Sequence, residues 1–416
     1  MLVWLAVTLA FAPRVDIEVS PYPAAIAAAD FDRDGRADVV TVHTETDEVW
    51  VLLSRSASDP ARIGPLQAGL SPSAVAAADV NDDKRPDIVV ANAIGNTVSV
   101  LLGRADGSFD AAHDFPVGNA PRGVAVADFD GDGHPDIAAA NLFDDTVSIL
   151  RGSGDGTFQP GVAIPVTGGP GAVAAADLEP NGTMDLVVSV VLDEQAVVAL
   201  LGNGDGTFAE RGRAAVGTWP TQAVIADLDG DRVPDVGVAG HNDDALSILT
   251  GHGDGTFDAP LRISTGPFPT AVASADVDAD GVVDLVSADS FTDTLSLLRG
   301  RGGAAYDAPV LLATNVMPVG TVAADFTRDR VVDLATANSL TGDVSMIVNE
   351  RASPPLCTGD CDGGGMVSVN ELILSVNVAL RQSTVADCIA ADPDDDAAVT
   401  IGELIAAVRN ALDGCN

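Results

Sequence analysis

Short apolar runs separated by polar turns recur along most of the chain. One unit opens with small apolar residues at 74–78 (AVAAA), crosses an acidic turn, and continues with a second apolar run at 88–91 (IVVA). A third run follows at 97–102 (TVSVLL), and a fourth run comes after a glycine turn that ends in an aromatic residue. Short runs with alternating or continuous apolar positions, bounded by glycine and aspartate, predict four β-strands per unit.

The acidic turn between the first and second runs returns in fixed register. Its full form, D-x-D-x-D-G-x-x-D, occurs at Asp30, Asp32, Asp34, Gly35 and Asp38. The copies lie 49 or 50 residues apart, which is the length of one four-stranded propeller blade. We therefore predict an all-β, seven-bladed β-propeller over residues 11–350. The first aspartates of the seven copies are Asp30, Asp79, Asp128, Asp177, Asp227, Asp276 and Asp325.

The two ends of the repeat region predict that the ring is closed. Phe11 precedes Asp30 by 19 residues, and Phe257 precedes Asp276 by the same separation, so the chain begins with the last strand of a unit. The seventh unit has no fourth strand of its own. Residues 11–19 are expected to supply that strand, because closure removes the exposed edges of an open β array.

The acidic turns have the chemistry of calcium sites. Carboxylates at alternate positions of a tight turn form the oxygen cage that Ca²⁺ prefers, whereas Mg²⁺ requires stricter octahedral geometry. Glycine at the sixth position allows the positive φ that such a turn needs. Copies one, three and six keep every element, so we expect the strongest sites there. Their predicted ligands are Asp30, Asp32, Asp34, Asp38, Asp128, Asp130, Asp132, Asp136, Asp276, Asp278, Asp280 and Asp284.

Four copies depart from the full pattern. Copy two has Asn81 at its third position and Lys84 in place of glycine, and copy five has Arg232 there, so we expect weaker binding at both. Copies four and seven are the sites most expected to stay empty. Each ion is expected to hold its own hairpin together rather than to bridge to a ligand. The candidate ligands of these four copies are Asp79, Asn81, Asp83, Asp87, Asp227, Asp229, Asp231, Asp235, Asp177, Glu179, Asn181, Asp185, Asp325, Asp329 and Asp333.

The third repeat shows the motifs of the unit in full: ADFDGDGHPD (127–136), AN (140–141), TVSIL (146–150) and GDGTF (154–158). These motifs resemble the FG-GAP or VCBS repeat, the seven-bladed propeller of integrin α-subunits and of many bacterial surface proteins. The resemblance covers about residues 11–350. It implies Ca²⁺ in the hairpin loops and recognition surfaces on the loops between strands, without indicating a ligand.

The net charge and the first ten residues bear on the partners and the location of the protein. A net charge of −40 argues against a nucleic-acid partner, because phosphate binding needs clustered Lys and Arg. Residues 1–10 (MLVWLAVTLA) are a candidate signal peptide, with Ala10-Phe11-Ala12 as the cleavage motif, and the alternative is an ordinary buried strand. Calcium cages of modest affinity need surroundings rich in Ca²⁺, so we expect a secreted or cell-surface protein.

The composition changes after a linker at 351–356. All four cysteines, Cys357, Cys361, Cys388 and Cys415, fall within residues 357–416. An even number of cysteines in a small module of an exported protein predicts two disulfides with three possible pairings. A zinc site is the alternative.

Two loops of this C-terminal region have EF-hand-like spacing, and an amphipathic helix is predicted after each loop. The duplicated loop and helix resembles a dockerin, which implies a cohesin-like partner. Gly364 and Ala397 depart from the expected pattern, so calcium binding is better supported than cohesin binding, and a disulfide-bonded cap without a partner is the alternative. The predicted calcium ligands are Asp360, Asp362, Glu371, Asp392, Asp394, Asp396 and Glu403.

No catalytic motif stands out. The chain has no H-E-x-x-H, G-x-S-x-G or phosphate-binding G-x-x-x-x-G-K-[ST] sequence, and its five histidines are dispersed. We expect a monomeric, calcium-binding binding or adhesion protein that recognises an extracellular protein or glycan and is attached to a partner by its tail. The alternative is a calcium-dependent carbohydrate-active enzyme, similar to a polysaccharide lyase, or a carbohydrate-binding part of a polysaccharide-degrading complex. Trp50 and Trp219 are its sugar-stacking candidates.

Overall fold

The computed structural model describes residues 9–55 and 60–350. The chain divides into two units, Met1–Arg351 and Ala352–Asn416, and the described residues belong to the first. They form strands and turns without a helix, so no helix that could cross a membrane occurs among them. The predicted dockerin-like module, its calcium ligands and its cysteines lie outside the described residues. So does most of the candidate signal peptide.

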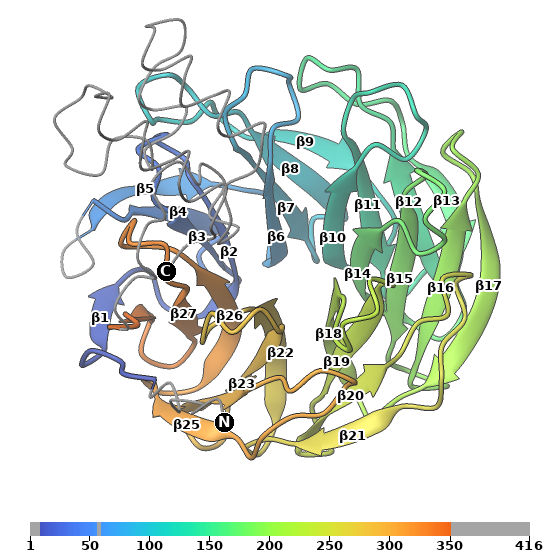
Figure 1. Cartoon of the computed structure of the whole chain (residues 1–416). Coiled ribbons are helices and arrows are strands. Elements are labelled where there is room, and N and C mark those ends of the chain that lie inside the picture. Colours follow the sequence, from blue (N-terminus) through green and yellow to red (C-terminus); the bar gives the residue numbers. More distant parts are fainter. Residues whose placement is uncertain (1–8, 56–59, 351–416) are drawn as a thin grey trace, which may run out of the picture. The chain divides into compact units, whose positions relative to one another are not determined.

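The described strands form seven four-stranded sheets around a central axis (Figure 1). The predicted seven-bladed propeller is therefore confirmed. The innermost strands of the blades are β2 (Pro23–Ala29), β6 (Pro72–Ala78), β10 (Pro121–Ala127), β14 (Pro170–Ala176), β18 (Pro220–Ala226), β22 (Pro269–Ala275) and β26 (Pro318–Ala324). The second strands are β3 (Asp38–His43), β7 (Asp87–Asn92), β11 (Asp136–Asn141), β15 (Asp185–Val190), β19 (Asp235–Gly240), β23 (Asp284–Asp289) and β27 (Asp333–Asn338).

The outer half of each blade continues the antiparallel order. The third strands are β4 (Glu48–Leu53), β8 (Thr97–Leu101), β12 (Thr146–Leu150), β16 (Ala196–Gly202), β20 (Ala245–Leu249), β24 (Thr294–Leu298) and β28 (Asp343–Ile347). The outermost strands are β5 (Ala61–Gln67), β9 (His113–Pro116), β13 (Val162–Pro165), β17 (Phe208–Ala215), β21 (Leu261–Ser264), β25 (Val310–Ala313) and β1 (Val15–Glu18).

The ring closes through the N-terminal strand. β1 pairs antiparallel with β28, with Val15 opposite Met346 and Glu18 opposite Asp343. Phe11 forms a bridge with Asn349, as Phe257 does with Gly251 in the fifth blade. The predicted closure by residues 11–19 is therefore confirmed, and the seventh blade obtains its outermost strand from the opposite end of the repeat region.

The core lies between adjacent blades. Seven clusters of buried side chains each join two neighbouring sheets, and the cluster around Ile26 and Val344 joins the seventh blade to the first. The second strand of every blade is buried along its whole length. Near the axis there is little space, since a Cβ added to Gly123 would lie 2.8 Å from the Cα of Ala172 in the next blade. Small residues on the inner strands follow from this convergence.

The sixth position of every acidic loop has a positive φ. The φ of Gly35 is +85°, and Lys84, Arg232 and Arg330 adopt +66°, +71° and +65° although they carry a Cβ. A left-handed conformation costs such residues roughly 1–2 kcal/mol. The loop backbone therefore keeps its shape where glycine is missing, and what varies between the copies is the set of side-chain oxygens.

Candidate metal centres

Each acidic loop joins the innermost strand of a blade to its second strand, and its first aspartate holds the loop closed. Asp30 accepts the backbone N–H of Asp34 on Oδ1 at 3.0 Å and that of Gly35 on Oδ2 at 2.9 Å. In all seven loops the N–H of the sixth residue donates to the first aspartate. This aspartate therefore shapes the loop before any cation is considered.

The aspartate at the ninth position of each acidic loop is buried, and its hydrogen bonds connect two loops of the same blade. Asp136 Oδ2 accepts the N–H of Phe129 at 2.9 Å, and its Oδ1 accepts the N–H of Gly152, beyond the third strand, at 2.7 Å. Equivalent pairs of bonds form in the other six blades. Burial raises the pKa of Asp136 to about 6 and that of Asp38 to about 7.

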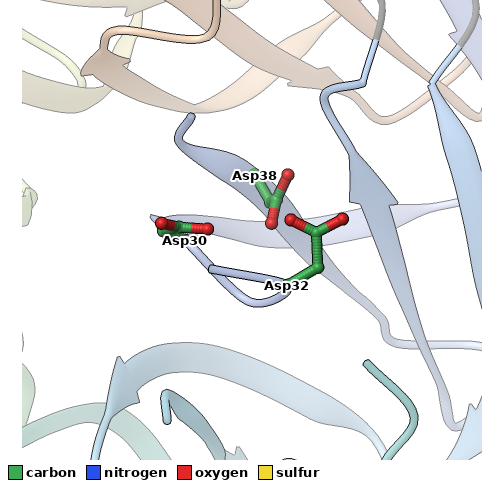
Figure 2. Close-up of side chains that lie close together, drawn as sticks. All are labelled: Asp30, Asp32 and Asp38. Carbon is green, nitrogen blue, oxygen red and sulfur yellow. The ribbon is translucent and has the colours of Figure 1, made fainter. Parts of the chain in front are cut away.

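Three carboxylates converge in four of the loops. In the first loop, Asp30, Asp32 and Asp38 each offer an oxygen within 4.8 Å of the others, and Figure 2 shows their carboxylates facing a shared space. Asp32 Oδ1 is buried there without a hydrogen-bond partner. Converging carboxylate oxygens fit a hard cation such as Ca²⁺. The equivalent groups are Asp128, Asp130 and Asp136; Asp227, Asp229 and Asp235; and Asp276, Asp278 and Asp284.

The predicted fifth-position ligands lie outside these groups. Asp34 Oδ1 instead accepts the N–H of Arg36 at 2.9 Å, which forms a local turn. The other six loops repeat this bond, so the fifth residue stabilises the turn whether or not it also reaches a cation. The fifth-position residues of the seven loops are Asp34, Asp83, Asp132, Asn181, Asp231, Asp280 and Asp329.

Loops two, four and seven do not assemble three carboxylates within the described residues. Asn81 replaces a carboxylate in loop two. Glu179 in loop four accepts a bond from Asn181 Nδ2 at 3.0 Å, and Thr327 in loop seven donates to Asp333 at 3.2 Å. The fifth loop does assemble its group despite Arg232. The number of converging carboxylates therefore places loop five with loops one, three and six.

Arginine side chains approach three of the four groups. Arg55 Nε lies 3.0 Å from Asp32, Arg151 Nε lies 3.6 Å from Asp130, and an Arg299 nitrogen lies 3.9 Å from Asp278. Each arginine pairs with the aspartate at the third position of its loop. Asp229 of the fifth loop has no ion pair with any described residue. A guanidinium opposes a second cation nearby, so the fifth loop offers the least hindered group.

Replacing Arg55 with glutamine is expected to raise the calcium affinity of the first loop about five- to tenfold. Removing one unit charge close to a divalent ion is worth on the order of 1 kcal/mol at a solvent-exposed site. Calcium titration calorimetry measures the change. The matched control is Arg104→Gln, because Arg104 occupies the equivalent position in the second blade but pairs with Asp110, outside the acidic loop. Equal affinity gains in both variants would contradict a local effect of Arg55.

The opposite face of the ring carries exposed apolar side chains. They lie on the loops that enter the innermost strand and on the turns between second and third strands. Phe291, Ile94 and Phe143 are 75%, 71% and 62% exposed. Phe268 lies 5.6 Å from the ring of Phe291, and Trp219 is also exposed. We did not predict this surface from the sequence, although most of these residues fall at two fixed positions of the repeat.

Trp50, the other sugar-stacking candidate, does not belong to this surface. It lies on β4, is half-buried, and donates its indole N–H to Glu48 at 3.2 Å.

The fold and the acidic loops together define the class of this protein. It is a closed propeller of seven repeats, and each repeat has one acidic loop between its first two strands. Three segments match the FG-GAP-like repeat family, at residues 79–139, 129–188 and 227–287. The chain thus carries FG-GAP-like repeats in these segments, which confirms that part of the resemblance seen in its motifs. No curated protein matches the chain.

Solved structures share the fold at low sequence identity. BBS1N in complex with ARL6DN matches with a TM-score of 0.58 and 12% identity, over 83% of this chain and 99% of that chain. A protein from Lactobacillus plantarum gives 0.57 and 18%, over 73% and 88%. An Agrocybe aegerita lectin that recognises non-reducing terminal N-acetylglucosamine gives 0.51 and 20%, over 72% and 81%. These likenesses concern the fold alone.

Proposed function

We propose that this protein is a calcium-stabilised, extracellular binding or adhesion module. The observation that carries the calcium assignment is the convergence of three carboxylates at the same place in four blades. Each group contains one buried aspartate that ties its hairpin to the next loop of the blade. A cation bound to such a group would link the innermost and second strands, so its main effect would be on the stability of the blade.

A role in recognition is supported by the division of the ring into two faces. The acidic loops occupy one face, and exposed apolar side chains lie on the loops of the other, where the ring of Phe268 contacts the rings of His241 and Phe291. Contiguous exposed apolar surface is typical of interaction sites in soluble proteins, and this aromatic group supports such a site here. The FG-GAP-like repeats fit a binding module, and a lectin is among the solved propellers that share the fold.

The tail and the location complete the proposal. The acidic loops need millimolar Ca²⁺ if their affinity is modest, which fits a place outside the cell. The paired EF-hand-like loops at 360–371 and 392–403 are proposed to bind Ca²⁺ and to attach the propeller to a cohesin-like partner. An extracellular protein or glycan is proposed as the ligand of the propeller itself.

A glycan and protein array probed with the full chain tests the binding role. We expect at least one defined ligand in millimolar Ca²⁺, and weaker binding in chelator because the loops that present the opposite face lose support. Array signals should be compared with those of a heat-denatured sample. Absence of any ligand specific to the folded chain would count against a binding module.

A further inference from the structure

The innermost strands of the seven blades surround an axial cavity of about 170 Å³. Each of these strands has a bulge or irregularity just after its first proline. The residue that follows this proline lines the cavity in six of the seven blades, and these six residues mark the mouth of the channel. This mouth lies at the end of the strands opposite the acidic loops. The cavity is smaller than the pockets that hold drug-sized ligands, so its occupant is a small group.

One charged side chain lines this cavity, and it is basic. Arg122 follows Pro121 in β10, is exposed, and makes no hydrogen bond or ion pair with the described residues. The chain has 61 acidic and 21 basic residues, yet no carboxylate belongs to the lining. A free guanidinium presents five N–H donors in a fork that matches a carboxylate. The mouth of the channel is therefore suited to an anion.

Two hydroxyl groups of the cavity lining have free lone pairs that can accept hydrogen bonds. Ser73 directs its hydroxyl proton to the backbone carbonyls of Ala91 and Pro121, at 3.1 and 2.7 Å. Thr270 directs its proton to the carbonyls of Ala288 and Pro318 in the same way. The lone pairs of both hydroxyl oxygens remain available as acceptors for a ligand hydroxyl.

Gln222 adds a donor to the lining. Its Oε1 accepts the N–H of Val272 at 3.4 Å, which leaves its Nε2 hydrogens to donate. Val75 and Val124 supply apolar lining next to these polar groups. The cavity thus combines one cation, one amide donor, several hydroxyl acceptors and an apolar wall.

We propose that the mouth of the axial channel binds a single carboxylate-bearing sugar unit of the uronate type, with Arg122 holding the carboxylate. The ligand's hydroxyls donate to Ser73 and Thr270, and its C–H face lies on the apolar wall. This site names the ligand class of the binding module proposed above and rests on that function. It is separate from the acidic loops, which lie at the other end of the innermost strands.

Titration of the full chain with galacturonate in millimolar Ca²⁺, followed by ligand-observed NMR and calorimetry, tests this site. We expect galacturonate to bind at least tenfold more tightly than its methyl ester or galactose, because a charge-assisted pair with Arg122 is lost in both neutral ligands. Acetate should bind more weakly than galacturonate. Equal binding of the charged and neutral sugars, or equal binding of acetate and galacturonate, would overturn the proposal.

Arg122→Gln should weaken galacturonate binding about tenfold or more without changing the melting temperature, since Arg122 has no partner among the described residues. Arg62→Gln is the control variant, because it makes the same change of charge on the outermost strand β5. Galacturonate binding that survives in Arg122→Gln would place the site elsewhere. If the array identifies a ligand but galacturonate does not bind, the proposed binding function is supported and the uronate site is refuted.

Discussion

Chelation of calcium is expected to lower the free energy of unfolding of the propeller by about 6 kcal/mol relative to the protein in 1 mM Ca²⁺. A cation that binds only the folded chain stabilises it by RT ln(1 + [L]/Kd), which is about 1.4 kcal/mol at tenfold excess over a Kd of ~10⁻⁴ M. Four converging carboxylate groups give about four such contributions. Urea unfolding followed by circular dichroism, in calcium and in chelator, measures the difference.

A matched pair of variants in the fifth loop tests which carboxylates hold the cation. Asp229 belongs to the converging group, whereas Asp231 lies outside it and accepts the N–H of Val233. Asp229→Asn should remove about 1.4 kcal/mol of the calcium-dependent stability, and Asp231→Asn should remove little. Mg²⁺ at the same concentration should stabilise less than Ca²⁺, because it requires stricter geometry. Identical unfolding curves in calcium and chelator would refute calcium stabilisation.

Replacing Asp289 with asparagine is expected to stabilise the propeller by about 2–3 kcal/mol at pH 7.5. Asp289 is fully buried at the end of β23, and burial raises its pKa to about 6. A carboxyl whose folded pKa lies above its unfolded pKa destabilises the fold when it ionises. The cost is about 1.4 kcal/mol for each pH unit that separates the two pKa values. Asparagine removes that charge and keeps the shape of the side chain.

The other blades show that an amide fits this position. Asn92 and Asn141 occupy it in the second and third blades, and each donates Nδ2 to a serine hydroxyl of the next strand, at 2.8 and 2.9 Å. Ser296 is the equivalent serine beside Asp289. It donates its hydroxyl to Asp289 Oδ2 at 2.5 Å and accepts the N–H of Gly266 at 3.0 Å, and that N–H also lies 3.2 Å from Asp289 Oδ2. In Asp289→Asn the hydroxyl would turn away and accept a bond from Nδ2, as in the second and third blades, and the N–H of Gly266 would keep Ser296 Oγ as its acceptor.

The stabilisation should depend on pH in a defined direction. Below about pH 4 Asp289 is protonated in both states, so the variant and the wild type should have similar stability. The advantage of Asp289→Asn should grow between about pH 4 and 6 and stay constant above about pH 6. Urea unfolding at pH 4 and pH 7.5, both in chelator so that bound cations do not contribute, measures it. An advantage of equal size at both pH values would argue against a buried charge as its cause.

Asp284→Asn is the control within the same strand. Asp284 is equally buried and its pKa is also raised to about 6, but its two oxygens accept backbone N–H groups from Val277 and Gly300. An amide would turn its own N–H₂ toward one of these donors and leave it unsatisfied. Asp284→Asn should therefore be less stable than Asp289→Asn by about 2–3 kcal/mol in chelator.

The acidic turn and the ring could be predicted because their signals are local and repeated. The spacing of the aspartates from Asp30 to Asp38 predicts a single hairpin loop. The same spacing recurs every 49 or 50 residues, which predicts the length of one blade. The match of Phe11 with Phe257 placed the missing strand at the N-terminus, and pairing of β1 with β28 agrees. Such patterns are sufficient because neighbouring strands of one blade are also neighbours in sequence.

Other features could not be predicted because they depend on the path of the backbone in space or on contacts between residues that are distant in sequence. The aspartates at positions one, three and nine of a loop converge, whereas the aspartate at position five accepts the backbone N–H two residues later. This difference depends on the path of the loop. The approach of Arg55 to Asp32 spans 23 residues and two strands. Arg122 has no repeated counterpart, so the sequence offered no reason to notice it among 21 basic residues.

The number of blades, the place of the acidic loop in each blade and the strand that closes the ring follow from the amino-acid sequence, because repeat length and turn chemistry act within single hairpins. Which carboxylates face one another and which charges approach them is visible in the folded chain alone. The same holds for the meeting of residues from all seven blades, Arg122 among them, at one channel mouth. The facing carboxylates depend on the path of each loop and of its blade. The channel mouth depends on how the blades pack around the axis, which brings together residues that no local pattern connects.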